Sequence, residues 1–250
     1  MRRLPDYGNW VPLKLVWGPG ILALIFLALA FVYPPMIAVF VVVLAIFLYF
    51  SYSRREFSHT GGGVQDKILG LLLSHLEWNG EGCALDIGCG NGPVTIMLAR
   101  SHPASTITGT DYWGARWDYS KEACEGNARL EGVEQRVSFQ KASASKLPFE
   151  EGRFDAVVSN LVFHEVADVK NKREVIREAL RVVKKGGHFA FQDLFLWKGI
   201  YGAPEDLLST IRSWGIKRAE FIKTSDAPFI PKALKLPFMV GRIAIIRGEK

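Results

Sequence analysis

A glycine-rich run flanked by acidic residues is the part of this sequence best suited to binding a small molecule. The run reads DIGCGNG over residues 86–92, and Asp111 closes the next apolar segment. Glycine lets the backbone turn sharply and approach a ligand without a Cβ atom in the way. A carboxylate such as that of Asp111 accepts hydrogen bonds from both hydroxyls of a ribose. Because the glycines are spaced G-x-G-x-G, not G-x-G-x-x-G, the run argues against a dinucleotide reductase.

An adjacent histidine and glutamate could move a proton. His164 and Glu165 follow Asn160, and we expect these residues in a loop beside the same site. Histidine changes charge near neutral pH, and a carboxylate can also accept a proton. We therefore predict His164 and Glu165 as catalytic groups on the acceptor side, needed where the acceptor must lose a proton.

Nothing in the sequence indicates a metal site or a disulfide framework. The three cysteines, at positions 83, 89 and 124, are too few and too scattered for either, and no H-E-x-x-H pattern is present. We therefore expect no metal and a reducing compartment.

Short apolar runs alternate with amphipathic stretches from about residue 56 onward. This alternation predicts an α/β domain with a mostly parallel, seven-stranded sheet, whose last two strands pair as an antiparallel hairpin at one edge. Open sheets of this kind bind ligands at the carboxyl ends of their strands, where residues 86–92 fall. The expected strands are 83–87, 106–111, 137–140, 154–159, 188–192, 218–223 and 242–247; the expected helices are 64–76, 93–100, 121–130, 171–183 (ended by Gly186-Gly187) and 205–213.

Three segments, in order, resemble class I S-adenosylmethionine-dependent methyltransferases. Residues 85–92 resemble the first motif of that family, residues 147–159 resemble its stretch through the fourth strand, and residues 177–188 resemble the helix and turn before its fifth strand. The resemblance covers roughly residues 64–193. It implies a Rossmann-like, doubly wound fold, methyl transfer as the activity, and S-adenosyl-L-methionine as the cofactor.

The resemblance also implies roles for individual residues of the donor site. The backbone of Gly88 and Gly90 would line the methionine part of the donor, and Asp86 would hold its amino group directly or through water. Asp111 resembles the ribose-binding acid of the family, with Tyr112 beside the adenine.

Further along the chain, Ser143 and Ala144 stand where the family places its adenine contact. Many members have an aspartate at the position of Ser143, so this chain departs from the pattern there. Asn160 stands where the family faces the reacting centre, and Asn91 completes the predicted donor-binding set.

The N-terminal fifth of the chain has the composition of a membrane segment. Residues 21–50 contain no charged side chain. The apolar stretch from Leu15 to Tyr52 would run about 57 Å as one helix, against a hydrocarbon core of roughly 30 Å. Pro34 and Pro35 interrupt it in the middle, where two missing backbone donors end a helix. We therefore predict a transmembrane hairpin, with helices over about residues 13–33 and 36–53.

The flanks of this hairpin predict its orientation. Arg2, Arg3 and Lys14 precede the first helix, and Arg54-Arg55 follow the second, whereas the turn between them has no basic residue. The positive-inside rule then places both ends, and the domain that follows, in the cytoplasm. The uncharged turn leaves open a hairpin that enters one leaflet and returns. A core hairpin of a soluble protein is the third alternative, disfavoured because residues 21–50 are apolar on every face.

We therefore divide the chain into a membrane-anchoring hairpin over residues 1–55 and a methyltransferase domain over residues 56–250. The formal net charge of +6 suits anionic lipid as well as nucleic acid. With an apolar hairpin present, we expect membrane lipid and a lipophilic small-molecule acceptor, such as a lipid headgroup or a quinone or prenyl precursor, and no nucleic acid. The rival hypotheses are a methyltransferase acting on protein or nucleic acid and a non-catalytic membrane scaffold that binds the donor.

Overall fold

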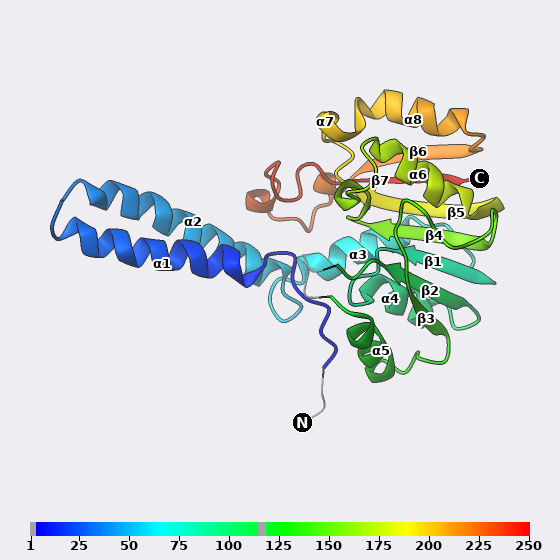
Figure 1. Cartoon of the computed structure of the whole chain (residues 1–250), viewed down its shortest axis with the longest axis horizontal. Coiled ribbons are helices and arrows are strands. Elements are labelled where there is room, and N and C mark those ends of the chain that lie inside the picture. The colour runs from blue at the N-terminus through cyan, green and yellow to red at the C-terminus, as the bar shows by residue number, and fades with distance from the viewer. Residues whose placement is uncertain (1–3, 115–118) are drawn as a thin grey trace. The chain divides into compact units, whose positions relative to one another are not determined.

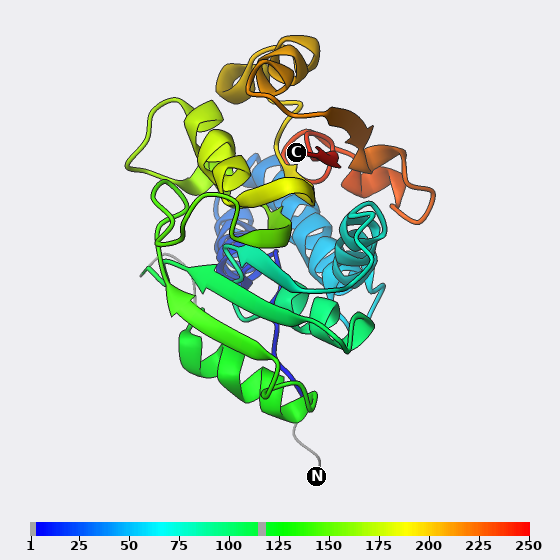
Figure 2. The same cartoon turned by 90° about the vertical axis from the view of Figure 1, so that its right-hand side faces the viewer.

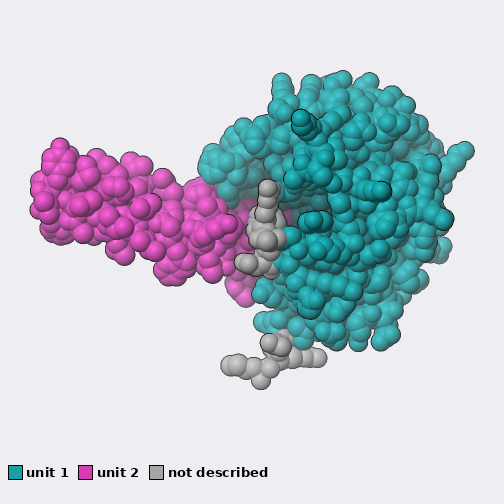
Figure 3. All heavy atoms as spheres, in the orientation of Figure 1, with its two compact units in different colours: residues 1–8, 69–250 teal, residues 9–68 magenta. Residues whose placement is uncertain are grey.

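The structure is a computed structural model of the chain and describes residues 4–114 and 119–250. The residues group into two compact units (Figure 3), one of residues 9–68 and the other of residues 1–8 together with 69–250. Arg2 and Arg3, which entered the prediction of membrane orientation, lie outside the described residues.

The smaller unit contains two long apolar helices that pack against each other as an antiparallel pair (Figure 1). They are α1 (Leu13–Ala30) and α2 (Met36–Phe57), joined by a turn that contains Pro34 and Pro35. The predicted break at the two prolines is therefore present. The first helix ends three residues earlier than expected, because the residue before a proline is disfavoured in helical conformation and the chain turns ahead of it. The second extends further, with Arg54 and Arg55 in its last turn, where basic side chains complement the helix dipole.

Both helices are long and apolar enough to cross a membrane. Their most apolar windows have mean hydropathies of 2.1 and 2.4, and only 6% of each window is buried inside the protein. A core helix of a soluble protein passes the same test of length and composition, but it is mostly buried. The side chains of α1 and α2 therefore lack the protein cover that a soluble core would give them.

The larger unit is built on a seven-stranded sheet in the order β3-β2-β1-β4-β5-β7-β6 (Figures 1 and 2). Strands β1 to β5 run parallel, and β7 pairs antiparallel with both β5 and β6. The mostly parallel seven-stranded sheet and the antiparallel pairing of its last two strands agree with the sequence prediction. The strands are β1 (Cys83–Ile87), β2 (Thr106–Asp111), β3 (Val137–Lys141), β4 (Phe154–Asn160), β5 (Val183–Asp193), β6 (Arg218–Lys223) and β7 (Ala244–Glu249).

Helices cover both faces of this sheet (Figure 2), as is usual where the strand order reverses direction between β1 and β4. On one face, α6 packs on β5 and α8 on β6, and both helices contribute to a core that includes Val157, Ile176 and Phe189. The helices are α3 (Val64–Ser74, which spans the boundary of the two units), α4 (Pro93–Ser101), α5 (Lys121–Leu130), α6 (Lys172–Arg181), α7 (Lys198–Tyr201) and α8 (Pro204–Ser213), with 3-10 turns at Phe163–Glu165, Thr224–Asp226 and Lys232–Leu234.

One boundary differs clearly from the prediction. We expected a helix over residues 171–183 ended by Gly186-Gly187, but α6 ends at Arg181 and Val183 already begins β5. Val183 pairs with Phe154, and the register then shifts before Ala156 pairs with His188. Gly186 supplies the positive φ of 77° that this irregularity needs, so the glycine serves a bulged strand and does not end a helix.

Candidate active site

The carboxyl ends of four parallel strands bring the predicted site residues to one edge of the sheet. Ile87 at the end of β1 pairs with Thr110 on one side and with Ser159 on the other, and Asn160 pairs with Gln192. The glycine run, Asp111, Asn160 and the end of β5 therefore lie along the same edge. This edge contains the switch point between β1 and β4, where open α/β sheets bind their ligands.

The glycine run forms a tight loop between β1 and α4. Gly88, Gly90 and Gly92 have φ angles of 74°, 57° and 86°, a region that other residues rarely adopt. The N–H groups of Gly88 and Cys89 both donate to the carbonyl oxygen of Thr110, at 2.7 and 2.9 Å. A Cβ atom on Gly88 would overlap the side chain of Val162, so this position also requires glycine for packing.

Asp111 holds the middle of the loop in place. Its Oδ2 atom accepts the N–H of Gly90 at 2.9 Å, and its Oδ1 atom accepts the N–H of Trp113 at 2.8 Å. The indole Nε1 of Trp113 in turn donates to the carbonyl oxygen of Gly90 at 3.0 Å. Each carboxylate oxygen keeps a lone pair after these bonds, so a half-buried, pre-oriented carboxylate is left to accept the hydroxyls of a ribose.

Asp86 lies beneath the loop, where it is buried. Its Oδ2 atom accepts the hydroxyl of Thr95, in the first turn of α4, at 2.7 Å. Burial disfavours the charged carboxylate and raises its pKa to about 7, against the opposing effect of the Thr95 hydrogen bonds. Asp86 therefore supports the loop from below, and its contact with the amino group of the donor stays a prediction.

Asn91 joins the loop to the N-terminal segment of the same unit. Its Oδ1 atom accepts the N–H of Ser120 at 3.2 Å, and its Nδ2 atom donates to the carbonyl oxygen of Asp6 at 3.3 Å. Buried Asn127 on α5 binds the same backbone residue twice, accepting the N–H of Asp6 at 3.0 Å and donating to its carbonyl oxygen at 2.9 Å. The segment that contains Asp6 is thus fastened beside the loop, an arrangement that no local sequence pattern indicates.

The residues predicted beside the adenine lie on neighbouring loops. Tyr112 is 64% exposed, with the ammonium group of Lys141 5.2 Å from its ring centroid, so its ring is accessible for stacking. Ala144 is buried, and Ser143 Oγ lies 2.8 Å from Ser145 Oγ. Asp168, which the sequence did not single out, accepts the hydroxyl of Ser145 at 2.5 Å. An acid from another segment thus lies close to the position where many family members have their aspartate.

The predicted proton-moving pair lies on the 3-10 turn after β4, against a buried acid at the end of β5. His164 Nδ1 lies 2.7 Å from Asp193 Oδ1, and His164 Nε2 lies 3.5 Å from Glu165 Oε1. Asp193 is fully buried, and its Oδ2 atom accepts the N–H of Phe163 at 2.8 Å. Burial lowers the pKa of His164, but the hydrogen bonds to Asp193 and Glu165 outweigh it and raise the pKa to about 9.

Four further polar residues complete this end of the site: Asn160, Gln192, Tyr201 and Thr224. Asn160 Oδ1 accepts the side-chain amide of Gln192 at 2.8 Å, and Gln192 in turn accepts the hydroxyl of Thr224 at 3.2 Å. Burial and the neighbouring Asp193 carboxylate raise the pKa of the Tyr201 hydroxyl. The Asn160 side chain is therefore held by Gln192, a residue that sequence reasoning missed because the pairing runs across two strands.

A metal-binding cluster is not found within residues 4–114 and 119–250: no three His, Cys, Asp or Glu side chains there converge to hold an ion.

The strand order, the glycine loop and the Asp111 carboxylate are similar to those of class I S-adenosylmethionine-dependent methyltransferases. Residues 85–191 match the model of a methyltransferase domain family, Methyltransf_11. The cofactor is therefore S-adenosyl-L-methionine, and the residues present fit it: a half-buried carboxylate for the ribose and a loop of positive-φ glycines over which no Cβ atom projects.

Two curated relatives are named for small-molecule chemistry, and another is a ribosomal RNA small subunit methyltransferase. The ubiquinone/menaquinone biosynthesis C-methyltransferase of Desulfotalea psychrophila is 31% identical over 43% of this chain and 39% of its own length. The 27-O-demethylrifamycin SV methyltransferase of Amycolatopsis mediterranei is 34% identical over 45% of this chain and 38% of its own length. The chain thus spans less than half the length of these relatives.

A solved structure shares the fold at lower identity. The geranyl diphosphate C-methyltransferase from Streptomyces coelicolor A3(2), crystallised with S-adenosyl-L-homocysteine, superposes with a TM-score of 0.57 at 14% identity. The match covers 74% of this chain and 79% of that one. At this identity the likeness shows the fold alone.

Proposed function

We propose that the protein is a methyltransferase anchored in a membrane, and that it transfers a methyl group from S-adenosyl-L-methionine to a lipophilic or membrane-associated small molecule. One observation carries the proposal: a donor-type loop and two apolar helices with almost no protein cover occur in the same chain. Tethering a catalytic domain to a bilayer raises its effective concentration toward anything dissolved there. The names of curated relatives, which include quinone and rifamycin methyltransferases, support a small-molecule acceptor.

In this proposal residues 1–55 provide the anchor and residues 56–250 the catalytic domain, which faces the cytoplasm. The basic residues Lys14, Arg54 and Arg55 flank the apolar helices at the ends away from the turn. Lipid covers α1 and α2, whose uncovered side chains would otherwise cost free energy in water, at about 25 cal/mol per Å² of exposed apolar area. A lipophilic acceptor then reaches the active site from the membrane.

When bound, the donor would supply an electrophilic methyl group, with its thioether as a good leaving group for an in-line displacement by the acceptor. The residues of the chain therefore mainly align the reactants and exclude water. Asp111 accepts the ribose hydroxyls, the backbone of Gly88 and Gly90 lines the methionine part, and Ser143 and Ala144 lie beside the adenine.

His164 and Glu165 act where the acceptor must lose a proton. Because the pKa of His164 is about 9, its imidazole is charged at neutral pH and becomes a free base only as the pH rises. The rate of such a reaction therefore increases with pH up to about 9. Full activity in a variant with both His164→Ala and Glu165→Ala would show that neither residue takes part in the reaction.

The acceptor is found most directly by methyl transfer from labelled donor into a total lipid extract. The full chain is reconstituted in vesicles made from that extract, and labelled products are identified by mass spectrometry. We expect label in a lipophilic product with the wild-type chain and none with Asp111→Ala. Donor binding without labelled product from lipid, protein or nucleic acid would instead support a non-catalytic scaffold.

The membrane topology is tested by a cysteine in the turn between the helices. Val32 is exposed in that turn, and Thr60 is exposed after α2. If the hairpin spans the bilayer, Val32→Cys reacts with an impermeant maleimide from the far side and Thr60→Cys from the cytoplasmic side. Labelling of both positions from the same side contradicts a spanning hairpin and supports one that enters a single leaflet.

A further inference from the structure

Two segments of the larger unit meet at the carboxyl edge of the sheet, beside the His164–Asp193 pair. One is residues 194–201, which follow β5; the other is residues 224–243, which join β6 to β7 and stand out from the sheet in orange and red (Figure 1). The pairing of Asp193 with Ala244 brings their ends together, and the N–H of Leu196 donates to the carbonyl oxygen of Arg242 at 3.1 Å. The two segments therefore form one continuous surface.

This surface exposes large apolar side chains among basic ones. Trp197 is 41% exposed, Leu236 is 39% exposed and Phe238 is 65% exposed. Lys198 and Lys232 are exposed nearby, and the guanidinium of Arg242 lies 4.5 Å from the Trp197 ring centroid. We name the set Trp197, Lys198, Lys232, Lys235, Leu236, Phe238 and Arg242 the aromatic–basic patch.

The segment that carries most of the patch is fixed to the domain by its other side chains. Ile230, Leu234, Val240 and Ile243 are buried, and they alternate along the chain with the exposed residues of the patch. The exposed apolar side chains thus lie on a segment whose other side is buried in the domain. Outward aromatic, apolar and basic side chains on one surface are the composition of a membrane interface contact.

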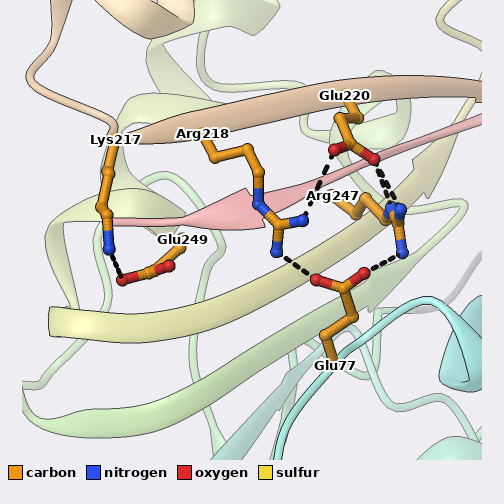
Figure 4. Close-up of polar contacts among 6 residues, drawn as sticks. All are labelled: Glu77, Lys217, Arg218, Glu220, Arg247 and Glu249. Atoms are coloured by element: carbon orange, nitrogen blue, oxygen red, sulfur yellow. Dashed lines mark hydrogen bonds and ion pairs between the residues drawn. The ribbon is translucent and has the colours of Figure 1, made fainter.

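The charges of the patch differ from those on the neighbouring strands. On β6 and β7, Arg218 and Arg247 are bound by Glu77 and Glu220, and Lys217 by Glu249 at 2.6 Å (Figure 4). In the described part of the chain, no carboxylate lies within ion-pair distance of the patch residues Lys198, Lys232, Lys235 and Arg242. Four uncompensated cations around exposed aromatic rings complement a surface that is apolar inside and anionic outside.

We propose that the aromatic–basic patch is a second membrane contact, which seats the catalytic domain on anionic lipid with the carboxyl edge of its sheet toward the bilayer. Aromatic side chains favour the headgroup level, and lysine and arginine are attracted to anionic headgroups. In this orientation the acceptor passes from the lipid directly to the edge that holds His164 and Asp193. The inference rests on the proposed function, since it requires that the chain works at a membrane.

Photo-crosslinking of the full chain tests the contact. Benzoylphenylalanine is placed at Phe238 or, as control, at Leu130, which is 45% exposed at the end of α5, the helix that packs on the edge strand β3. The chain is reconstituted in vesicles of phosphatidylcholine alone or in an equal mixture with phosphatidylglycerol. We expect lipid adducts at position 238 but not at 130, more of them in the mixed vesicles, and fewer at high salt, because roughly 1 M salt shortens the screening length to about 3 Å.

Three outcomes are told apart in the same samples. Flotation with the vesicles reports the anchor, and binding of S-adenosylhomocysteine reports the donor site. If the chain floats and binds that ligand but position 238 gives no more lipid adduct than position 130, the patch is not a membrane contact. Adducts from position 238 to a second chain would likewise overturn the inference, in favour of a contact between copies. Loss of flotation itself would instead overturn the proposed anchoring.

A matched pair of double variants provides an independent measure. Phe238→Glu with Lys232→Glu removes one apolar and one basic side chain of the patch, and Leu130→Glu with Arg129→Glu makes the same change of charge on α5. Hydrogen exchange of residues 194–201 and 224–243 is compared with and without mixed vesicles. We expect vesicles to protect these residues in the α5 variant and not in the patch variant; equal protection in both would contradict the proposal.

Discussion

Replacing Asp193 with asparagine removes the buried negative charge beside His164 while it keeps the size of the side chain. The carboxylate lies 2.7 Å from His164 Nδ1 and, together with Glu165, outweighs the effect of burial on the pKa of that imidazole. Without the charge, only Glu165 is left to oppose the effect of burial on the pKa of His164. We expect the pKa to fall clearly below 9.

The size of the effect on stability follows from the shift in the pKa of His164. A rise from 6.5 to about 9 corresponds to roughly 3 kcal/mol in favour of the charged imidazole in the folded protein, at about 1.36 kcal/mol per pKa unit. Since the pKa is raised on folding, this stabilisation is fully present below pH 6.5 and is lost as the pH rises through about 9. The wild-type chain should therefore lose stability over this window, and Asp193→Asn should lose less.

The assay is an NMR titration of the full chain labelled with ¹³C-histidine, with the His164 signal assigned by its loss in His164→Gln. Asp206→Asn is the control, because Asp206 is an exposed acid paired with Arg173 at 2.5 Å. A His164 pKa near 6.5 in the wild type, or one that stays near 9 in Asp193→Asn, would refute the role given to Asp193. The pH dependence of methyl transfer should shift in parallel with the titration.

Three other predictions concern the donor loop and its supports. Gly88→Ala should unfold at lower temperature and lose binding of S-adenosylhomocysteine, because its Cβ atom would overlap Val162. Gly126→Ala, at an open position in α5, should instead gain about 0.5–1 kcal/mol in the free energy of unfolding. Equal melting temperatures of the two variants would contradict this prediction. Asn127→Ala removes both hydrogen bonds to the backbone of Asp6, so it should lower the free energy of unfolding by about 1–3 kcal/mol and speed hydrogen exchange of the Asp6 amide. An unchanged exchange rate would disprove this prediction. Asp86 has its pKa raised from 3.8 to about 7, so the folded protein holds this proton more tightly than the unfolded chain, and stability falls by roughly 4 kcal/mol as the pH rises through this window. Asp86→Asn should remove that fall in urea unfolding of the donor-free protein, and a fall that persists would show that Asp86 is not its source.

The donor loop was predictable because its signals are local. The apolar run before Asp86, the three spaced glycines and Asp111 lie within about one β-α-β unit, and β1 and β2 have the predicted bounds. The mostly parallel sheet followed from the alternation of strands and helices, whereas the order of its strands comes from the structure. The boundary of α6 and β5 was wrong because Gly186 is typical of both a helix end and a bulged strand, and only the pairing of Val183 with Phe154 decides between them.

The acceptor side of the site depends on pairings that leave no trace in the local sequence. Asp193 meets His164 only because β4 and β5 are neighbours whose ends coincide, and Gln192 meets Asn160 for the same reason. The fastening of Asp6 by Asn127 joins residues that lie more than a hundred positions apart in the chain. Such long-range contacts follow from the assembled sheet, so sequence reasoning could place His164 near the site but could not predict its charge.

The central claim is that the loop at residues 86–92 and the Asp111 carboxylate hold the methyl donor. Calorimetric titration of the full chain with S-adenosylhomocysteine tests it most directly, with Asp111→Ala measured beside the wild type and NADH as the competing class of ligand. We predict binding at one site per chain in the wild type, strong loss of that binding in Asp111→Ala, and no heat with NADH. Absence of binding in the wild type, or equal binding in Asp111→Ala, would contradict the claim.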